Sequence, residues 1–130
     1  MKQLLRNMYI DNKRVLLRCD FNVPMAGGNI TDETKITKSL ETINYLLSKN
    51  CKIIILSHLG RVKTEEDKKA NSLLPVKSSL ERLLNKPVKF ASDILSVETK
   101  NTALNLQNGE ILLLENTRFL HVPNKLQSNL

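Results

Sequence analysis

The chain has 130 residues, 41% of them hydrophobic, which is enough for one domain with a buried core and argues against a disordered tail. Its formal net charge of +7, from 20 basic and 13 acidic residues, indicates an anionic partner, either a small phosphorylated molecule or a nucleic acid. No window approaches the ~20 apolar residues of a membrane span, and the first residues lack the pattern of a secretory signal, so we expect a cytoplasmic protein without a membrane partner.

Two strands with a helix between them are predicted in the first part of the chain. The apolar run at residues 15–21 predicts a buried strand, and Pro24 with the glycines after it predicts a loop. Apolar residues recur at helical spacing between residues 36 and 47, which predicts a helix that ends near Asn50. The β-branched residues of 52–56 predict a core strand.

The second part of the chain repeats this alternation. Ser72 is predicted to cap a second helix, which has Pro75 in its first turn and an apolar stripe that ends at Leu84. Because two parallel neighbours need a crossover connection, alternating strands and helices predict right-handed crossovers and a mainly parallel sheet in a three-layer α/β domain. The other predicted segments are a solvated loop at 61–71, a brief strand at 88–90, a weaker helix near 97–106 and a strand at 110–115.

Several common types of site are not expected in this chain. Cys19 and Cys51 lie in apolar runs without C-x-x-C spacing, so they are predicted to be buried free thiols. The sequence contains no G-x-x-x-x-G-K-[ST] or G-x-G-x-x-G motif, so no nucleotide cradle is predicted. Two distant histidines without a carboxylate cluster give no support for a metal site.

Polar side chains follow three of the predicted strands at the point where each strand ends. In an open parallel sheet, ligands bind beyond the carboxyl ends of the strands, where these side chains would meet. Arginine forks bind phosphate oxygens in bidentate fashion, so a phosphorylated metabolite with hydroxyl groups fits better than DNA. The residues are Arg18, Asp20 and Asn22 after the first strand, Ser57, His58, Gly60 and Arg61 after the second, and Glu115, Asn116 and Arg118 after the fourth.

Two residues near this edge have alternative interpretations. A cation such as Lys35 in the first turn of a helix opposes the helix macrodipole at about 0.3–1 kcal/mol, which favours a functional role. The alternative is a lysine that extends into water. His58 is either a turn histidine hydrogen-bonded to backbone or an anion-binding side chain, and its neighbours Gly60 and Arg61 favour the second interpretation.

Four motifs then identify a resemblance that covers nearly the full length of the chain. They are RCDFNVP at 18–24, ITD at 30–32, SHLGR at 57–61 and LENTRF at 114–119. In this order they resemble motifs of the phosphoglycerate kinase family, among them R-x-D-[FL]-N-V-P, S-H-L-G-R-P and L-E-N-[VT]-R-F. The chain departs from the family pattern at Lys35, where the family normally has arginine, and at Val62, where it usually has proline.

The resemblance implies a role for each site residue. Asp20 and Asn22 would hold the hydroxyl and carboxylate end of 3-phosphoglycerate, while the phosphate would be bound by three basic residues. Lys35 would be catalytic, because it stands where the family arginine stabilises the transferring phosphoryl group. The phosphate-binding residues would be His58, Arg61 and Arg118, and Phe21, Leu59 and Gly60 lie within the same contact segments.

The resemblance also implies what surrounds this chain in the family. Residues 1–130 would form an incomplete amino-terminal domain of a two-domain, hinge-bending and usually monomeric enzyme of glycolysis. That enzyme moves a phosphoryl group between 1,3-bisphosphoglycerate and ADP, or from Mg-ATP to 3-phosphoglycerate. The carboxyl-terminal domain that binds Mg-ATP or Mg-ADP is missing here, so this chain is expected to bind no nucleotide and to be inactive alone.

Two other functions and one physical property follow from the sequence. A degenerate module that binds a phosphorylated acid without catalysis is the main alternative. Nonspecific nucleic-acid binding through the +7 charge is less favoured, because the basic residues are scattered and aromatic residues for stacking are scarce. A parallel sheet without all of its covering segments would expose strand edges and apolar surface, so we expect marginal stability and a tendency to aggregate.

Overall fold

Four apolar runs of the sequence form one parallel sheet in the computed structural model, which describes residues 9–60, 63–64, 66 and 71–121. The sheet has the strand order β1-β4-β6-β5, and every neighbouring pair is parallel. Its strands are β1 (Arg14–Arg18), β4 (Lys52–Leu56), β5 (Lys89–Ala91) and β6 (Ile111–Leu114). The predicted parallel α/β sheet is therefore confirmed.

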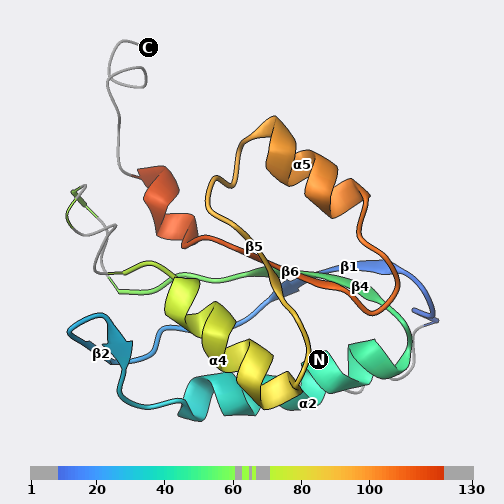
Figure 1. Cartoon of the computed structure of the whole chain (residues 1–130), viewed down its shortest axis with the longest axis horizontal. Helices are drawn as coiled ribbons and strands as arrows, with labels where there is room; N and C mark the ends of the chain where they lie inside the picture. The colour runs from blue at the N-terminus through green and yellow to red at the C-terminus, as the bar shows by residue number, and fades with distance from the viewer. Residues whose placement is uncertain (1–8, 61–62, 65, 67–70, 122–130) are drawn as a thin grey trace.

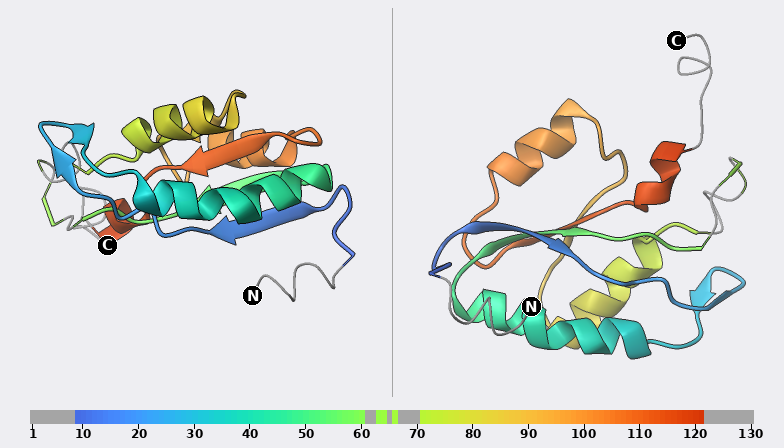
Figure 2. Two further views of the ribbon diagram at one scale, coloured as in Figure 1. Left: turned by 90° about the horizontal axis from the view of Figure 1, so that it is seen from below. Right: turned by 180° about the vertical axis from the view of Figure 1, so that it is seen from behind.

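Helices cover the sheet on both faces, as Figures 1 and 2 show. The chain runs across the sheet from β1 through β4 to β5 and then turns back to β6, which lies between β4 and β5. Because crossovers of one hand place the helix on the opposite face when the direction reverses, α2 and α4 lie on one face and α5 on the other. The helices are α2 (Thr34–Ser48), α4 (Leu74–Leu84) and α5 (Val97–Leu104), and a 3-10 helix, η1, spans Thr117–His121.

The main core lies between the sheet and the α2–α4 layer. Alternate residues of a strand point to opposite faces, so Ile53 and Ile55 of β4 face this layer and are fully buried. They pack in the same cluster as Ile43 of α2 and Leu80 of α4. Burying a side chain of this size contributes roughly 1.5–3 kcal/mol, so this layer is the main source of stability.

The second face of the sheet is covered only in part. Its smaller apolar cluster contains Leu112 and Leu114 of β6, under α5. In register with Leu112 lies Ile54, and in register with Ile54 lies Leu16 of the edge strand β1. Leu16 is 64% exposed, so among the described residues α5 covers the β5–β6 half of this face and no helix covers the β1 half.

Two local predictions need correction. The segment around Gly27 and Gly28 was predicted to be a loop, but it is a short antiparallel hairpin of β2 (Met25–Ala26) and β3 (Asn29–Ile30). Both glycines have positive φ, as a two-residue hairpin turn requires. The N-cap position of α4 is Leu73, because the helix begins one residue later than predicted, although Ser72 Oγ accepts a hydrogen bond from Leu74 N at 3.1 Å.

The other predicted strands and helices agree with the structure to within a few residues, whereas most of the loop predicted at 61–71 lies outside the described residues. Asn50 follows α2 with a φ of +59°, as expected of a residue that ends a helix region. Both cysteines are free thiols, with Cys51 buried and Cys19 half-buried, and burial raises the pKa of the Cys19 thiol to about 12. Within the described part of the chain, no helix has the length and apolar character needed to cross a membrane.

Candidate functional site at the carboxyl edge of the sheet

The residues that follow β1, β4 and β6 meet at one edge of the sheet. The strands are aligned so that Arg18 is in register with Leu56, and Ile55 with Leu113. Two backbone hydrogen bonds continue this alignment past the strand ends: Cys19 N donates to Leu56 O at 2.9 Å, and Thr117 N donates to Ser57 O at 3.0 Å. The structure therefore brings together three segments that lie far apart in the sequence.

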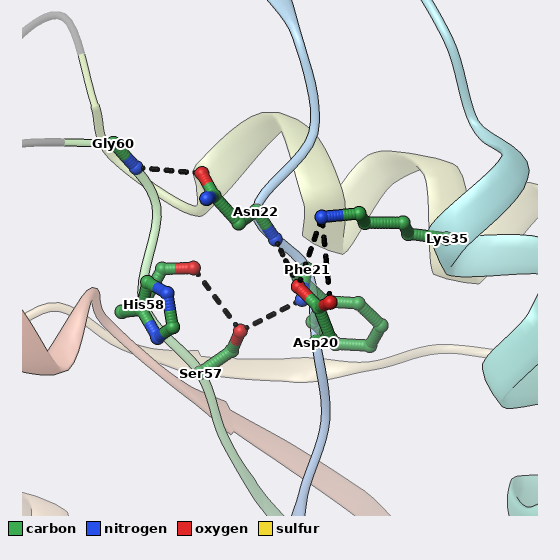
Figure 3. A network of polar contacts seen from close by, with 7 residues as sticks. All are labelled: Asp20, Phe21, Asn22, Lys35, Ser57, His58 and Gly60. Atoms are coloured by element: carbon green, nitrogen blue, oxygen red, sulfur yellow. Dashed lines mark hydrogen bonds and ion pairs between the residues drawn. The ribbon is translucent and has the colours of Figure 1, made fainter.

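A buried hydroxyl group joins the first two segments. Ser57 is 3% exposed, and its Oγ accepts a hydrogen bond from Phe21 N at 2.9 Å and donates one to His58 O at 3.2 Å (Figure 3). This contact fixes the backbone of Phe21 between Asp20 and Asn22. The side chains on either side of Phe21 are consequently held at the edge of the sheet.

Asp20 is an exposed carboxylate with two polar neighbours. Its Oδ1 accepts a hydrogen bond from Asn22 N at 3.1 Å, and its Oδ2 lies 3.3 Å from Lys35 Nζ. The hydrogen bond from Asn22 N, followed by the contact with Lys35, holds the pKa of the Asp20 carboxyl below its ordinary value. Asp20 is thus an anion at neutral pH and offers acceptor oxygens to a ligand hydroxyl group.

Lys35 lies in the first turn of α2, as predicted from the sequence. No acidic residue lies in that turn, so Asp20 on the neighbouring segment supplies the counter-charge for the ammonium group. The two side chains are 45% and 64% exposed, and an ion pair of this kind contributes only about 0–1 kcal/mol to stability. Its effect at the site is to hold the ammonium group of Lys35 beside the carboxylate of Asp20.

The orientation of the Asn22 amide follows from its contact with Gly60. Asn22 Oδ1 accepts a hydrogen bond from Gly60 N at 2.9 Å (Figure 3). Because a backbone N–H can only donate, the oxygen of the amide must face Gly60. The Nδ2 group then points away from that contact and offers its two protons to a ligand acceptor.

Gly60 is tied to two strand ends at once. Its N–H donates to Asn22 after β1, and its carbonyl oxygen accepts from Arg118 Nη1 after β6 at 2.7 Å. Its φ is +59°, and a Cβ atom at this position would lie 2.6 Å from Asn71 Oδ1. The backbone conformation therefore favours glycine here, and a Cβ atom would also force the Asn71 side chain to move.

His58 and Arg118 supply the other basic groups of the site. Burial, followed by the positive charge of Arg118, lowers the pKa of His58 below its ordinary value of 6.5, while Asp20 acts in the opposite direction. The imidazole is therefore mainly neutral at pH 7 in the ligand-free protein. Arg118 uses one guanidinium nitrogen on Gly60, which leaves the rest of the fork for an anion.

The remaining predicted residues have other surroundings. Phe21 and Leu59 are 0% and 1% exposed, so their side chains belong to the core and only their backbones reach the site. Arg18 is exposed at the end of β1. Arg61, predicted to bind phosphate, lies outside the residues that the structure describes.

Sequence reasoning placed Glu115 and Asn116 at this edge but gave them no role. Glu115 is 5% exposed and accepts hydrogen bonds from Ser72 Oγ at 2.6 Å and Leu73 N at 2.7 Å. It thus adds an acceptor for Leu73 N at the start of α4, beside Ser72 Oγ, which accepts from Leu74 N at 3.1 Å. Asn116 is fully buried, and its Nδ2 group donates hydrogen bonds to Leu59 O and Asn71 O in the segment between β4 and α4.

Taken as a set, these groups suit a small anion that also carries hydroxyl groups. The donors are the Nδ2 group of Asn22, the ammonium of Lys35, the imidazole of His58 and the guanidinium of Arg118, and the acceptor is the carboxylate of Asp20. Charge-assisted hydrogen bonds of this type are shorter and stronger than neutral ones. No group of three or more histidine, cysteine or acidic residues with metal-binding geometry occurs among the described residues.

Comparison with known proteins gives a consistent result. A family model described as phosphoglycerate kinase matches residues 5–129. Phosphoglycerate kinase of Listeria innocua is 46% identical over 127 residues, and that of Fusobacterium nucleatum is 45% identical over 128 residues. In both cases the match covers 98% of this chain and 32% of the relative, so the chain spans about a third of the length of these relatives.

Solved structures agree with the sequence matches. The crystal structure of phosphoglycerate kinase from Pyrococcus horikoshii superposes with a TM-score of 0.79 at 31% identity. The enzyme from Coxiella burnetii superposes with a TM-score of 0.75 at 37% identity. Each superposition covers 88% of this chain and 28% of the other.

Proposed function

Because this chain belongs to the phosphoglycerate kinase family, a family of phosphotransferases, we propose that it supplies most of a 3-phosphoglycerate site. The observation that carries the proposal is the convergence of Asp20, Asn22, His58 and Arg118 at one edge of the sheet. All four side chains are exposed or half-buried there, and their donors and acceptor match an anion with a hydroxyl group. The same site would hold the glycerate end of 1,3-bisphosphoglycerate.

Each residue has a part that its contacts support. Asp20, held as an anion, accepts a hydrogen bond from the ligand hydroxyl group, and Asn22 donates from Nδ2 to the carboxylate. His58 and Arg118 bind the phosphate. The negative charge of the bound phosphate would stabilise the protonated imidazole and so raise the pKa of His58. Arg61 completes this set in the proposal, on the strength of its place in the SHLGR motif alone.

Lys35 is proposed as the residue that faces the transferring phosphoryl group. It carries one positive charge at the start of α2, next to the glycerate-binding carboxylate of Asp20. Charge on the transferring group is spread over three oxygens, and a fixed cation stabilises it. Lysine does this as a point charge and lacks the bidentate fork of an arginine.

The reaction also needs a nucleotide, for which this chain has no predicted cradle. We propose that residues 1–130 are part of a glycerate-binding domain and that Mg-ATP or Mg-ADP is bound by the part of the relatives that the chain does not span. Phosphoryl transfer depends on holding both substrates in line, so the 130-residue chain alone should bind 3-phosphoglycerate without turning it over. The corresponding full-length protein would be a monomeric enzyme of glycolysis in the cytoplasm.

Calorimetric titration with 3-phosphoglycerate tests the site. The charge-changing variant Asn22→Asp removes the outward donors and should lower the affinity at least tenfold, since a second carboxylate repels the ligand. Asn101→Asp, on an exposed position of α5, makes the same change of charge elsewhere and should stay within twofold of the wild type. Equal losses in both variants would show that the ligand responds only to overall charge.

A coupled assay tests the absence of turnover. Purified chain is incubated with 3-phosphoglycerate and Mg-ATP, and formation of ADP is followed against a blank without protein. We expect no rate above the blank. A rate that scales with protein concentration and disappears in Lys35→Met would overturn the proposal that this chain is inactive alone.

A further inference from the structure

The Asn116 side chain makes three hydrogen bonds in a fully buried position. Its Nδ2 donates to Leu59 O at 2.7 Å and to Asn71 O at 2.8 Å, and its Oδ1 accepts from Arg118 N at 3.0 Å. Both protons of the amide and its oxygen are thus in use. Asparagine is suited to this position because it has two donors and one acceptor on a short side chain, whereas aspartate has no donor.

These three bonds act on the two segments that hold the ligand groups. The segment after β4 is held at Leu59 O by Asn116, at Gly60 N by Asn22 and at Gly60 O by Arg118. The segment after β6 is held at Arg118 N by Asn116 itself. Removing the amide would therefore release the β4 segment at Leu59 and Gly60. The backbone around His58 and Arg118 would stay in place, because it keeps the bonds from Thr117 N to Ser57 O and from Phe119 N to Asn116 O, each 3.0 Å long.

Glu115 strengthens this arrangement from the preceding position. Its carboxylate accepts from its neighbour's backbone, Asn116 N, at 2.7 Å, in addition to its bonds with Ser72 and Leu73. The backbone of Asn116 is thus fixed against the start of α4. The amide consequently has one position from which it reaches all three of its partners.

We propose that Asn116 is a positioning residue, which sets the distance between Arg118 and the Asn22–Gly60 pair and so matches the site to the length of a phosphorylated three-carbon acid. The proposal rests on the function proposed above and extends it to a residue that touches no ligand. Since Asn116 is buried, it acts only through its partners Leu59, Asn71 and Arg118. A ligand that spans the site should depend on Asn116, whereas a ligand that occupies the phosphate end alone should not.

Two ligands separate positioning from general weakening of the fold. 3-Phosphoglycerate must reach both Asn22 and Arg118, whereas inorganic phosphate needs only the basic end. In Asn116→Leu, which is neutral and similar in shape, we expect affinity for 3-phosphoglycerate to fall at least tenfold and affinity for inorganic phosphate to stay within twofold. Asn116→Ser keeps one hydroxyl group for a single partner and should give an intermediate loss for 3-phosphoglycerate.

Ile111→Val serves as the matched control, because Ile111 is buried at the start of β6 and lies at the opposite end of that strand from Asn116. It should bind both ligands as the wild type does. Equal losses for both ligands in Asn116→Leu, or a selective loss in Ile111→Val, would overturn the positioning role. A wild-type chain that binds neither ligand would refute the proposed function and leave the positioning role to the next measurement.

Amide hydrogen exchange in the ligand-free protein tests the positioning role without any ligand. The Gly60 N–H, which donates to Asn22 Oδ1, is compared with the Cys19 N–H, which donates to Leu56 O in the sheet. We expect the ratio of the Gly60 rate to the Cys19 rate to rise at least tenfold in Asn116→Leu and Asn116→Ser. A ratio within twofold of the wild type in both variants would overturn the proposal, because global destabilisation alone does not expose Gly60 selectively.

Discussion

Replacing Gly60 by alanine should damage both the fold and the site, and the size of the effect can be worked from the structure. The φ of Gly60 is +59°, in the left-handed region, where a residue with a Cβ atom costs about 1–2 kcal/mol. The added Cβ would lie 2.6 Å from Asn71 Oδ1 and 2.9 Å from Asn71 Cγ, closer than real Cβ atoms approach. The Asn71 side chain must then turn away, which costs about 0.5–1.5 kcal/mol more if its new position is off a rotamer.

A glycine with the same backbone conformation separates these two costs. Gly27 has a φ of +58°, and a Cβ atom there would meet nothing within 4 Å. Gly27→Ala should therefore lose only the backbone cost of about 1–2 kcal/mol, whereas Gly60→Ala should lose about 1.5–3.5 kcal/mol. Only Gly60→Ala should also weaken 3-phosphoglycerate binding, since only Gly60 bonds to Asn22 and Arg118.

Urea denaturation of the two variants and the wild type measures both costs. If the slope of the unfolding free energy against urea concentration is the same in all three proteins, a change in the midpoint of unfolding reports a change in stability. Equal losses in Gly60→Ala and Gly27→Ala would refute the argument from Asn71. Unchanged binding by Gly60→Ala would refute the argument that this peptide links the ligand groups.

Three further predictions concern single side chains. Because the pKa of His58 is lowered in the folded protein, its contribution to stability is present above the ordinary pKa of 6.5 and is lost as the pH falls through the lowered value. His58→Gln should therefore lose less stability between pH 7 and pH 5 than the wild type. Urea denaturation at each pH measures this difference. In an NMR titration, Lys35→Met should leave the pKa of Asp20 below its ordinary value, because the hydrogen bond from Asn22 N lowers this pKa more than the contact with Lys35 does. A return of the pKa to its ordinary value would show that the Lys35 contact has the larger effect. Leu16→Thr should reduce self-association in sedimentation experiments without a large loss of stability, because Leu16 is 64% exposed on the β1 half of the sheet. Unchanged association would show that another surface is responsible for it.

The layout of the fold could be predicted because the decisive signals are local. The β-branched run of 52–56 coincides with β4, and the apolar spacing between residues 36 and 47 lies within α2. The rule that ligands bind at the carboxyl ends of parallel strands was enough to group Asn22 with Arg118. Neither inference needed knowledge of a contact between distant residues.

The parts that could not be predicted depend on partners far apart in the chain. At the start of α4, Leu74 N donates to Ser72 Oγ, which a local rule could find, but Leu73 N donates to Glu115, 42 positions away, which such a rule could not find. Asn116 bonds to Leu59, 57 positions away, and nothing in its local sequence reveals this contact. The hairpin at Gly27 could have been predicted from the sequence, since a two-residue Gly-Gly loop between short extended segments is a known hairpin signal.

The central claim is that side chains after β1, β4 and β6 bind one phosphorylated acid together. NMR titration of isotope-labelled chain with 3-phosphoglycerate tests this most directly, with the backbone amide of Gly109, between α5 and β6, as an internal reference. We predict that the signals of Asn22, His58, Gly60 and Arg118 shift along one common binding curve while Gly109 stays in place. Signals that shift with different affinities, or none that shift at millimolar ligand, would contradict the account.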